Sequence, residues 1–311
     1  MNPPWSVIFF TTLIGAGQGL FVALFAVDAW SAFQGRVLLT QEFVAVSTGA
    51  ALILVGAGLC ASFFHLGRPG RAWRAAAMWR TSWLSREVIA LPVFMVLLAA
   101  YGVLHWFGRP RPALAAGALA IVACLALFLC TAMIYACLKF LQEWHTPLTL
   151  ANFTALGCAS GLTAAAALAS WCAPTLSYSY AAAALAVGAL AYLLRITALA
   201  RNARLRPKST LETAIGVKNP KIRQIAQGAM GGSFNTREFF HGRPREVVRA
   251  ARWILLVLIF PVPAVLMIFR PTSATVLFVA FVIQYLGLLA ERWYFFAEAK
   301  HPQNLYYQAI S

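Results

Sequence analysis

The sequence predicts an all-α, polytopic membrane protein with eight transmembrane helices in a single transmembrane domain over residues 1–311. Hydrophobic residues make up 61% of the chain and charged residues 11%, and the mean hydropathy is +0.73. A helix needs about 20 mostly apolar residues to cross a bilayer, and the sequence contains eight such runs. They lack the two-residue alternation over about ten residues that is typical of β-barrel strands.

The eight runs define the expected helices in chain order. The start, MNPPWSVIFF, has no basic segment and no small-residue cleavage site, so we expect the first run to be a retained helix rather than a signal peptide. We find no internal repeat of the kind that many secondary transporters contain. The predicted helices span roughly residues 6–31, 41–64, 86–107, 113–139, 149–171, 176–199, 250–270 and 274–297.

The longest connection is a basic segment over residues 200–249, between the sixth and seventh helices. Its STLE stretch has the form of a capping box, with Ser209 as N-cap and Glu212 returning the bond, and it predicts a short surface helix. Two roles are open for this loop. It is either a basic tether on anionic lipid headgroups or a docking surface for a cytoplasmic partner, which its length and aromatic residues favour.

The basic residues predict an orientation. If both chain ends share one side, the opposite side holds only four of the 25 Lys and Arg residues, and the other 21 lie with the chain ends. Short loops rich in Lys and Arg stay in the cytoplasm, whereas long loops count for less. Without the thirteen basic residues in or beside the long loop the ratio is still 8 to 4. Both termini are therefore predicted to be cytoplasmic.

The cysteines and histidines argue against a metal centre on this chain. The six cysteines lie in or at the ends of apolar runs without a CxxC pair, so we interpret them as small core residues. A membrane b-type haem takes two axial histidines at matching depth on facing helices. None of the five histidines is central in a run, and a shared depth for His65 and His145, which their positions allow, is not enough to predict a haem. We expect no haem and no metal site, and we place any cluster chemistry on another chain.

Few ionisable residues lie in the apolar runs, where such residues are costly and often functional. Lys139 and Glu143 are four residues apart and can pair with each other. Arg195 lies near a helix end, where we expect its long side chain to extend to the membrane interface. The remaining ones are Asp28 and His105 near the outer ends of their helices, and Glu291 and Arg292 in the last helix.

The stretch CASFFHLGRPGRAWRAAAMWRTSWLSRE, residues 60–87, joins the second and third helices. His65 ends one helix and Glu87 begins the next, and the connection is short enough for the two side chains to meet. Quinone reduction consumes two electrons and two protons. Histidine titrates near neutral pH, and a partly desolvated carboxylic acid can pass protons between water and a quinone ring. The alternatives are that His65 caps its helix and that Glu87 forms an interfacial ion pair with Arg86.

Two parts of this stretch, FFHLGRPGRAWRA and WRTSWLSREVIA, are similar to membrane subunits of the DMSO reductase anchor family, and GLLAERW in the last helix resembles an acidic–arginine motif of that family. The resemblance implies an eight-helix protein that exchanges electrons with quinone through a four-cluster iron–sulfur subunit, while the substrate chemistry takes place on a molybdopterin subunit. It also implies that His65 is the quinone-site histidine and Glu87 its nearby acidic residue.

Within the family, TAIGVKNPKIRQIAQGAMGGSFNTREFF and the ending AERWYFFAEAKHPQNLYYQ are most similar to the membrane subunit of quinone-dependent sulfite dehydrogenase complexes. This similarity implies a bacterial inner-membrane protein that passes electrons from cytoplasmic sulfite oxidation to ubiquinone or menaquinone, with its partner subunits on the cytoplasmic side. Arg71 and Arg74 are candidates for orienting the quinone or for contacting the partner, and Trp83 for a flat wall against the quinone ring.

Three alternatives remain from the sequence. The first is the reverse reaction, in which the chain is the quinol-oxidising anchor of a DMSO reductase or another S- or N-oxide reductase. The second, from another class, is a secondary transporter, which the scarcity of charges in the middle of the apolar runs disfavours. The third is a scaffold that binds no quinone. Membrane lipid is an expected partner in each case, and nucleic acid in none.

Overall fold

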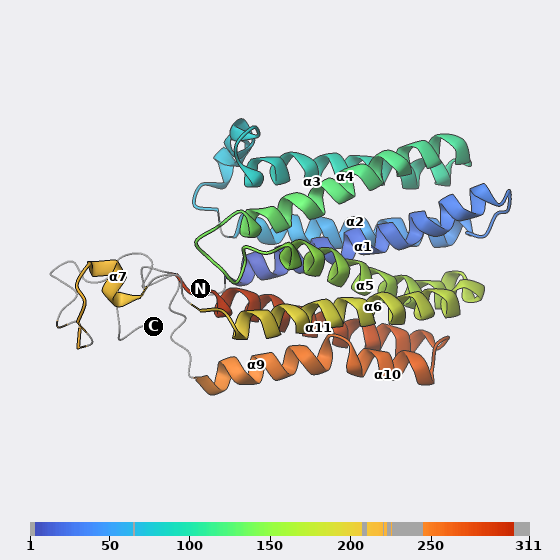
Figure 1. Ribbon diagram of the computed structural model, residues 1–311. Coiled ribbons are helices and arrows are strands. Elements are labelled where there is room, and N and C mark those ends of the chain that lie inside the picture. Colours follow the sequence, from blue (N-terminus) through green and yellow to red (C-terminus); the bar gives the residue numbers. More distant parts are fainter. Residues whose placement is uncertain are drawn as a thin grey trace.

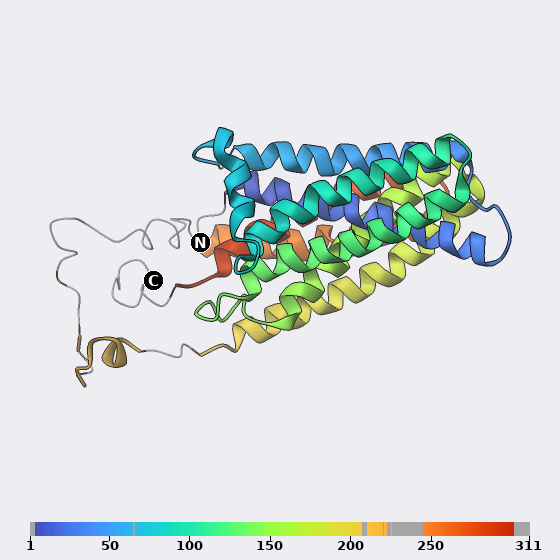
Figure 2. The ribbon, with the colours of Figure 1, turned by 90° about the horizontal axis from the view of Figure 1, so that it is seen from above.

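A computed structural model describes residues 4–64, 66–206, 210–219, 221–222, 225 and 245–301. In this part of the chain, eight helical spans are long and apolar enough to cross a membrane, which confirms the predicted class. They lie side by side along one axis (Figures 1 and 2). The spans are α1 (Trp5–Phe33), α2 (Gln41–Phe63), α3 (Trp83–Trp106), α4 (Pro110–Ala136), α5 (Pro147–Cys172), α6 (Pro174–Ala203), α9 with α10 (Arg245–Leu258 and Pro261–Phe269) and α11 (Ala274–Glu298).

The predicted ends of the spans agree with the structure to within a few residues. The seventh span differs from the prediction of one continuous helix. It is two helices, because α9 ends at Leu258 and α10 begins at Pro261. Pro261 and Pro263 have no backbone N–H to donate to the preceding turn, so they end one helix and begin the next. The third span begins at Trp83, where the Ser82 hydroxyl accepts a hydrogen bond from the backbone N–H of Ser85 at 3.3 Å.

The centre of the bundle is the crossing of α1 and α5, which pack against each other and against α2, α6 and α11. Glycine permits the crossing: a Cβ atom added at Gly161 would lie 2.0 Å from the carbonyl carbon of Gly19. Small residues bring membrane helices into backbone contact in this way. The α3–α4 pair forms one edge of the bundle and α9–α10 the opposite edge (Figure 1).

The outer surface of the bundle is suited to lipid. Ile53, Val96 and Val122 are 72%, 69% and 66% exposed on the flanks of their helices. Exposed tryptophans gather near both ends of the bundle, as expected where a membrane meets water; they are Trp5, Trp73, Trp79 and Trp253 near one end, and Trp30, Trp106 and Trp171 near the other. Most of the exposed tryptophans therefore lie toward the ends of the apolar belt.

One end of the bundle, here called the inner end, holds the start of α1, the end of α11 and the short helix α7 (Figure 1). The α2–α3 connection at this end contains a 3₁₀ helix, η1 (Pro69–Met78), that the sequence did not predict. The predicted surface helix is α7 (Leu211–Ile215). Its capping box uses Thr210 and Thr213, so the predicted Ser209–Glu212 box was wrong, and Ser209 itself lies outside the described residues.

The cysteines only partly follow the prediction. All six are free, and Cys124 and Cys130 are buried, as expected of core residues. Cys60 and Cys137 are exposed instead, near the inner ends of α2 and α4. The prediction was wrong for these two because an apolar run does not show which side of its helix faces lipid.

Candidate functional site

Glu87 lies one turn inside α3 and is only 3% exposed. Its Oε1 atom accepts a hydrogen bond from the hydroxyl of Thr131 on α4. In the described part of the chain, no basic side chain forms an ion pair with it. A buried carboxyl group without a cationic partner is expensive in a membrane, and such groups are often functional.

Arg86 turns away from its neighbour Glu87. Its Nε atom donates to the Trp79 carbonyl at 2.9 Å and its Nη2 atom to the Arg80 carbonyl at 2.8 Å. Its guanidinium group also lies over the Trp83 ring, 4.2 Å from the ring centre. The proposed ion pair between Arg86 and Glu87 was therefore wrong. Arg86 instead ties the α2–α3 connection to the start of α3.

Among the described residues, Arg71, Arg74 and Trp83 form no hydrogen bond or ion pair with Glu87 or Thr131. His65 lies outside the described residues. Arg71 and Arg74 are exposed on η1, where the Arg74 guanidinium lies over the adjacent Trp73 ring at 5.4 Å. Trp83 is half-buried beneath Arg86. The quinone-site roles of His65, Arg71, Arg74 and Trp83 remain predictions.

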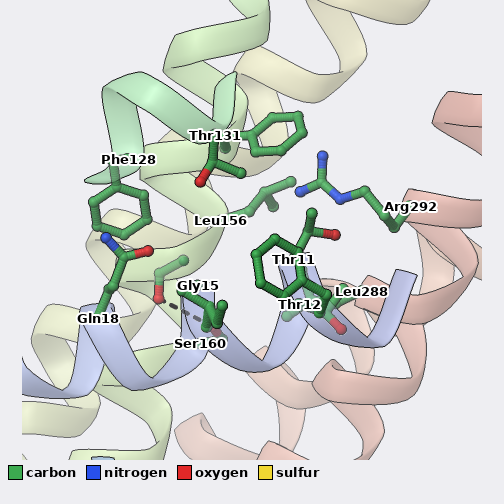
Figure 3. Close-up of a pocket in the computed structure, with 14 residues that line it drawn as sticks. Thr11, Thr12, Gly15, Gln18, Phe128, Thr131, Leu156, Ser160, Leu288 and Arg292 are labelled. Atoms are coloured by element: carbon green, nitrogen blue, oxygen red, sulfur yellow. Dashed lines mark hydrogen bonds between the residues drawn. The ribbon is translucent and has the colours of Figure 1, made fainter. Parts of the chain in front are cut away.

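Thr131 also lines a narrow pocket, here called the upper pocket, between α1, α4, α5 and α11 (Figure 3). Phe10, Phe128 and Phe153 supply flat apolar walls. Between these rings, polar side chains face the space; they are Thr11, Thr12, Gln18, Thr131, Ser160 and Arg292. Aromatic walls with a few hydrogen-bonding groups are typical of sites that bind an apolar ring carrying polar atoms.

The polar groups of the upper pocket are held in place by bonds to the surrounding backbone. The Gln18 amide donates to the Cys124 carbonyl at 2.8 Å, and the Ser160 hydroxyl donates to the Gly157 carbonyl at 3.0 Å. Each hydroxyl keeps acceptor capacity after donating one bond. The pocket can therefore orient a ligand, and the Thr131 hydroxyl connects it to Glu87.

Three charged residues form a second buried group beside this pocket, here called the inner cluster. Arg195 of α6 is 2% exposed, and its Nε atom lies 3.1 Å from Oε1 of Glu291 on α11. Arg292 Nη2 lies 3.6 Å from the other oxygen of Glu291. The expectation that Arg195 extends to the membrane interface was wrong. A charge within an apolar run was the available signal, but its partner lies on another helix.

Below the inner cluster lies a second pocket, the lower pocket, which reaches toward the inner end. Half-buried Glu143, Thr146 and Asn202 line its rim, and Arg195, Glu291 and Arg292 line its depth. Glu143 forms no ion pair with Lys139 within the described residues, so the suggested pairing was wrong. Arg292 and Phe153 line both pockets, and the Arg292 guanidinium lies 3.5 Å from the Phe153 ring centre.

The other end of the bundle carries a separate polar group, here called the outer cluster. One oxygen of Asp28 accepts a hydrogen bond from the Tyr101 hydroxyl at 2.8 Å and lies 2.8 Å from Nε2 of His105. Asp28 is 7% exposed. Among the described residues, no three His, Cys, Asp or Glu side chains gather closely enough to hold a metal ion at either end.

Comparison with known proteins shows which family the chain belongs to. The model of the family described as "DMSO reductase anchor subunit (DmsC)" matches residues 1–307, and the chain belongs to that family. It is therefore a multi-pass membrane anchor subunit of a DMSO reductase-type oxidoreductase, a role that implies catalytic partner subunits. The family membership favours the anchor over the transporter considered from the sequence.

A curated relative is similar over the full length of both chains. It is a sulfite dehydrogenase subunit of Allochromatium vinosum, which is 51% identical over 325 aligned positions and covers 100% of each chain. The similarity to a sulfite dehydrogenase subunit extends beyond the motifs around Glu87 to the whole chain.

Proposed function

We propose that this chain passes electrons from sulfite oxidation on its partner subunits to quinone bound in the upper pocket. The observation that carries the proposal is the hydrogen bond between Thr131, which lines the pocket, and the buried carboxyl group of Glu87. The 51% identity to a sulfite dehydrogenase subunit supports sulfite as the electron source. The partner is expected to hold the four-cluster iron–sulfur chain and the molybdopterin centre.

The residues of the upper pocket suit the chemistry of quinone reduction. The ring is expected to stack between Phe128 and Phe153, with its carbonyl oxygens toward Thr131 and the other hydroxyl groups. The pocket is narrow, so entry requires rotation of side chains such as Phe128 and Arg292. When the quinone receives two electrons from the partner, a protonated Glu87 can donate a proton to the Thr131 hydroxyl as that hydroxyl passes its own proton to a quinone oxygen. The second proton would follow by the same path once Glu87 has been protonated again.

The excess of basic residues at the inner end supports a cytoplasmic location for that end and for both termini. The inner end is also the closer end to the upper pocket, because Thr131 lies five residues before the last residue of α4. A partner docked on the cytoplasmic face would therefore stand near the pocket. Electrons and protons would reach the quinone from one side of the membrane, so turnover would move little net charge across it.

The decisive experiment measures sulfite-dependent quinone reduction by the whole complex in inside-out membrane vesicles. Glu87→Gln and Thr131→Val are expected to lower this rate at least tenfold, since general acid catalysis contributes about 10²–10⁴-fold. Sulfite oxidation with an artificial dye should be unchanged. Thr163→Val is the matched control, because Thr163 is buried on α5, bonds to the Ala159 carbonyl and lines neither pocket.

The same vesicles test the reverse reaction. If sulfite reduces no quinone while quinol drives DMSO reduction in a manner that depends on this chain, the direction and the substrate of the proposal are wrong. If Glu87→Gln and Thr131→Val reduce quinone at the wild-type rate, the upper pocket is not the quinone site.

A further inference from the structure

We propose that the lower pocket is a water-filled proton inlet in which Glu291 relays protons from the inner end of the bundle to the upper pocket. This inference rests on the proposed quinone site and adds the route that resupplies its protons. No feature of quinone binding itself requires a second carboxyl group with two arginines, so the inner cluster needs its own explanation.

The first observation is a set of buried polar atoms without a hydrogen-bond partner. Around the inner cluster these are Nη2 of Arg195, Nε of Arg292, Oδ1 of Asn152 and Oε2 of Glu291, which lies 3.6 Å from Arg292 Nη2, too far for a hydrogen bond. Asn152 and Glu291 are 5% and 1% exposed. Buried polar groups are almost always hydrogen-bonded, and water occupies such sites where there is room. All four residues line the lower pocket, so ordered water there would satisfy them.

The second observation is the position of the lower pocket, which reaches from the inner end to the wall of the upper pocket. The rim residues Glu143, Thr146 and Asn202 are half-buried, so the lower pocket begins close to the aqueous end of the bundle. Asn202 also donates to Oε2 of Glu298 at 3.1 Å, which adds another carboxyl group near the rim. At the far end, the stacked pair of Arg292 and Phe153 forms the partition between the two pockets.

The charges explain why water rather than an anionic ligand occupies the lower pocket. Arg195 and Arg292 are balanced by Glu291 in the depth and by Glu143 at the rim. Arginine stays protonated in proteins and cannot relay protons. Glu291 is therefore the one member of the inner cluster that can accept a proton from water and release it onward. Each quinone that takes up two electrons also takes up two protons, which the inlet would draw from the inner side.

The test uses the whole complex in membranes, with sulfite as donor and a short-chain quinone as acceptor. Glu291→Gln is expected to slow quinone reduction about tenfold or more and to increase the solvent deuterium isotope effect, because proton delivery becomes rate-limiting. Dye-linked sulfite oxidation should be unchanged. Added formate is expected to restore part of the rate lost in Glu291→Ala, a rescue that damaged packing would not give.

Two further variants keep the test decisive if Glu291 variants do not assemble. Asn152→Leu keeps the side-chain size but removes an unpartnered oxygen from the lower pocket, and Ala198→Val narrows that pocket without changing a charge. Both should slow quinone reduction severalfold. Ala191→Val is the matched control, since Ala191 is a buried alanine of α6 that lines neither pocket.

The outcomes separate the inlet from the quinone site. If the wild-type complex reduces quinone and Asn152→Leu, Ala198→Val and any assembled Glu291 variant do so at the same rate and isotope effect, the inlet is disproved and the proposed function survives. If the wild-type complex oxidises sulfite with dye but reduces no quinone, the proposed function fails and the inlet fails with it.

Discussion

The inner and outer clusters place buried charge at opposite ends of the same bundle, and they differ in how completely that charge is satisfied. In the outer cluster, Asp28 bonds to both Tyr101 and His105, and no side-chain atom of these three residues is buried without a partner. In the inner cluster, every member has at least one such atom, and a pocket lies on each side of Arg292. A closed cluster stabilises a fold, whereas an open one has capacity left for water or a ligand.

The region between the two clusters explains why they do not form one path. Phe21, Phe94 and Tyr101 pack edge to face there, with Leu24 and Leu98 in the same buried core. Along α1, every side chain between Gln18 and Asp28 is apolar, and the Tyr180 hydroxyl of α6 donates to the Ala23 carbonyl at 3.4 Å in this region. The α1 side chains between the two clusters therefore offer no group that can relay a proton from one cluster to the other.

The largest expected effect comes from breaking both clusters at once at the α1–α5 crossing. A side chain at Gly161 would meet the backbone of Gly19 and Leu20 at 2.0 and 2.1 Å. Gly161→Val should destabilise the protein by more than the about 1–3 kcal/mol that is usual for overpacking. The atoms that the new side chain meets belong to the backbone, which cannot rotate away as a side chain can. We expect no assembled complex in detergent extracts. Gly56→Ala is the control, since a Cβ there meets nothing within 4 Å. Normal assembly of Gly161→Val would contradict the close crossing.

The inner cluster can be broken alone. Arg195→Met leaves Glu291 buried without its closest partner and should destabilise the protein by about 3–5 kcal/mol. Arg195→Met combined with Glu291→Met should recover most of that loss, because a buried ion pair contributes little net stability over apolar residues of similar size. Thermal unfolding of the purified complex measures both. Stability should return in the double variant but quinone reduction should not, and recovery of both would make the cluster purely structural.

In the outer cluster we expect the reverse result, in which a substitution lowers stability but leaves activity unchanged. Asp28→Asn weakens the hydrogen bonds from Tyr101 and His105, and we expect a loss of about 1–3 kcal/mol in stability. Sulfite-dependent quinone reduction per assembled complex should stay at the wild-type level. The measurement pairs a denaturation midpoint with an activity assay. A large loss of turnover in an assembled Asp28→Asn complex would show that the two ends of the bundle are coupled.

The smallest expected effect lies at the inner end but outside both clusters. His301 follows α11 and packs edge-on against Phe140, with ring centres 5.2 Å apart, and partial burial lowers the pKa of its imidazole. The unfolded chain then binds a proton more readily than the folded one, so stability should fall slightly as pH drops below about 6.5. His301→Phe should flatten that part of a melting-temperature profile. An identical profile in the variant would show that His301 contributes nothing to it.

The eight spans, and Glu87 as a candidate residue, could be predicted from the sequence. A bilayer demands about 20 apolar residues for each crossing, so span number and position are local properties that composition reveals. A carboxyl group at the edge of such a run is costly wherever it lies, which made Glu87 a candidate without any knowledge of its neighbours. The excess of Lys and Arg at one end likewise follows from the chain alone, given the number of crossings.

Which polar groups meet could not be predicted from the sequence, because it depends on how the helices pack. Thr131 bonds to Glu87 from a different helix, and Arg195 pairs with Glu291 across 96 positions of sequence. Apolar periodicity is weak in helices that face lipid on one side and protein on the other, so the sequence does not show which way Arg195 points. Contact between helices is set by where glycines such as Gly19 and Gly161 allow backbones to approach. Those approaches place the two pockets around Arg292, which no local pattern could reveal.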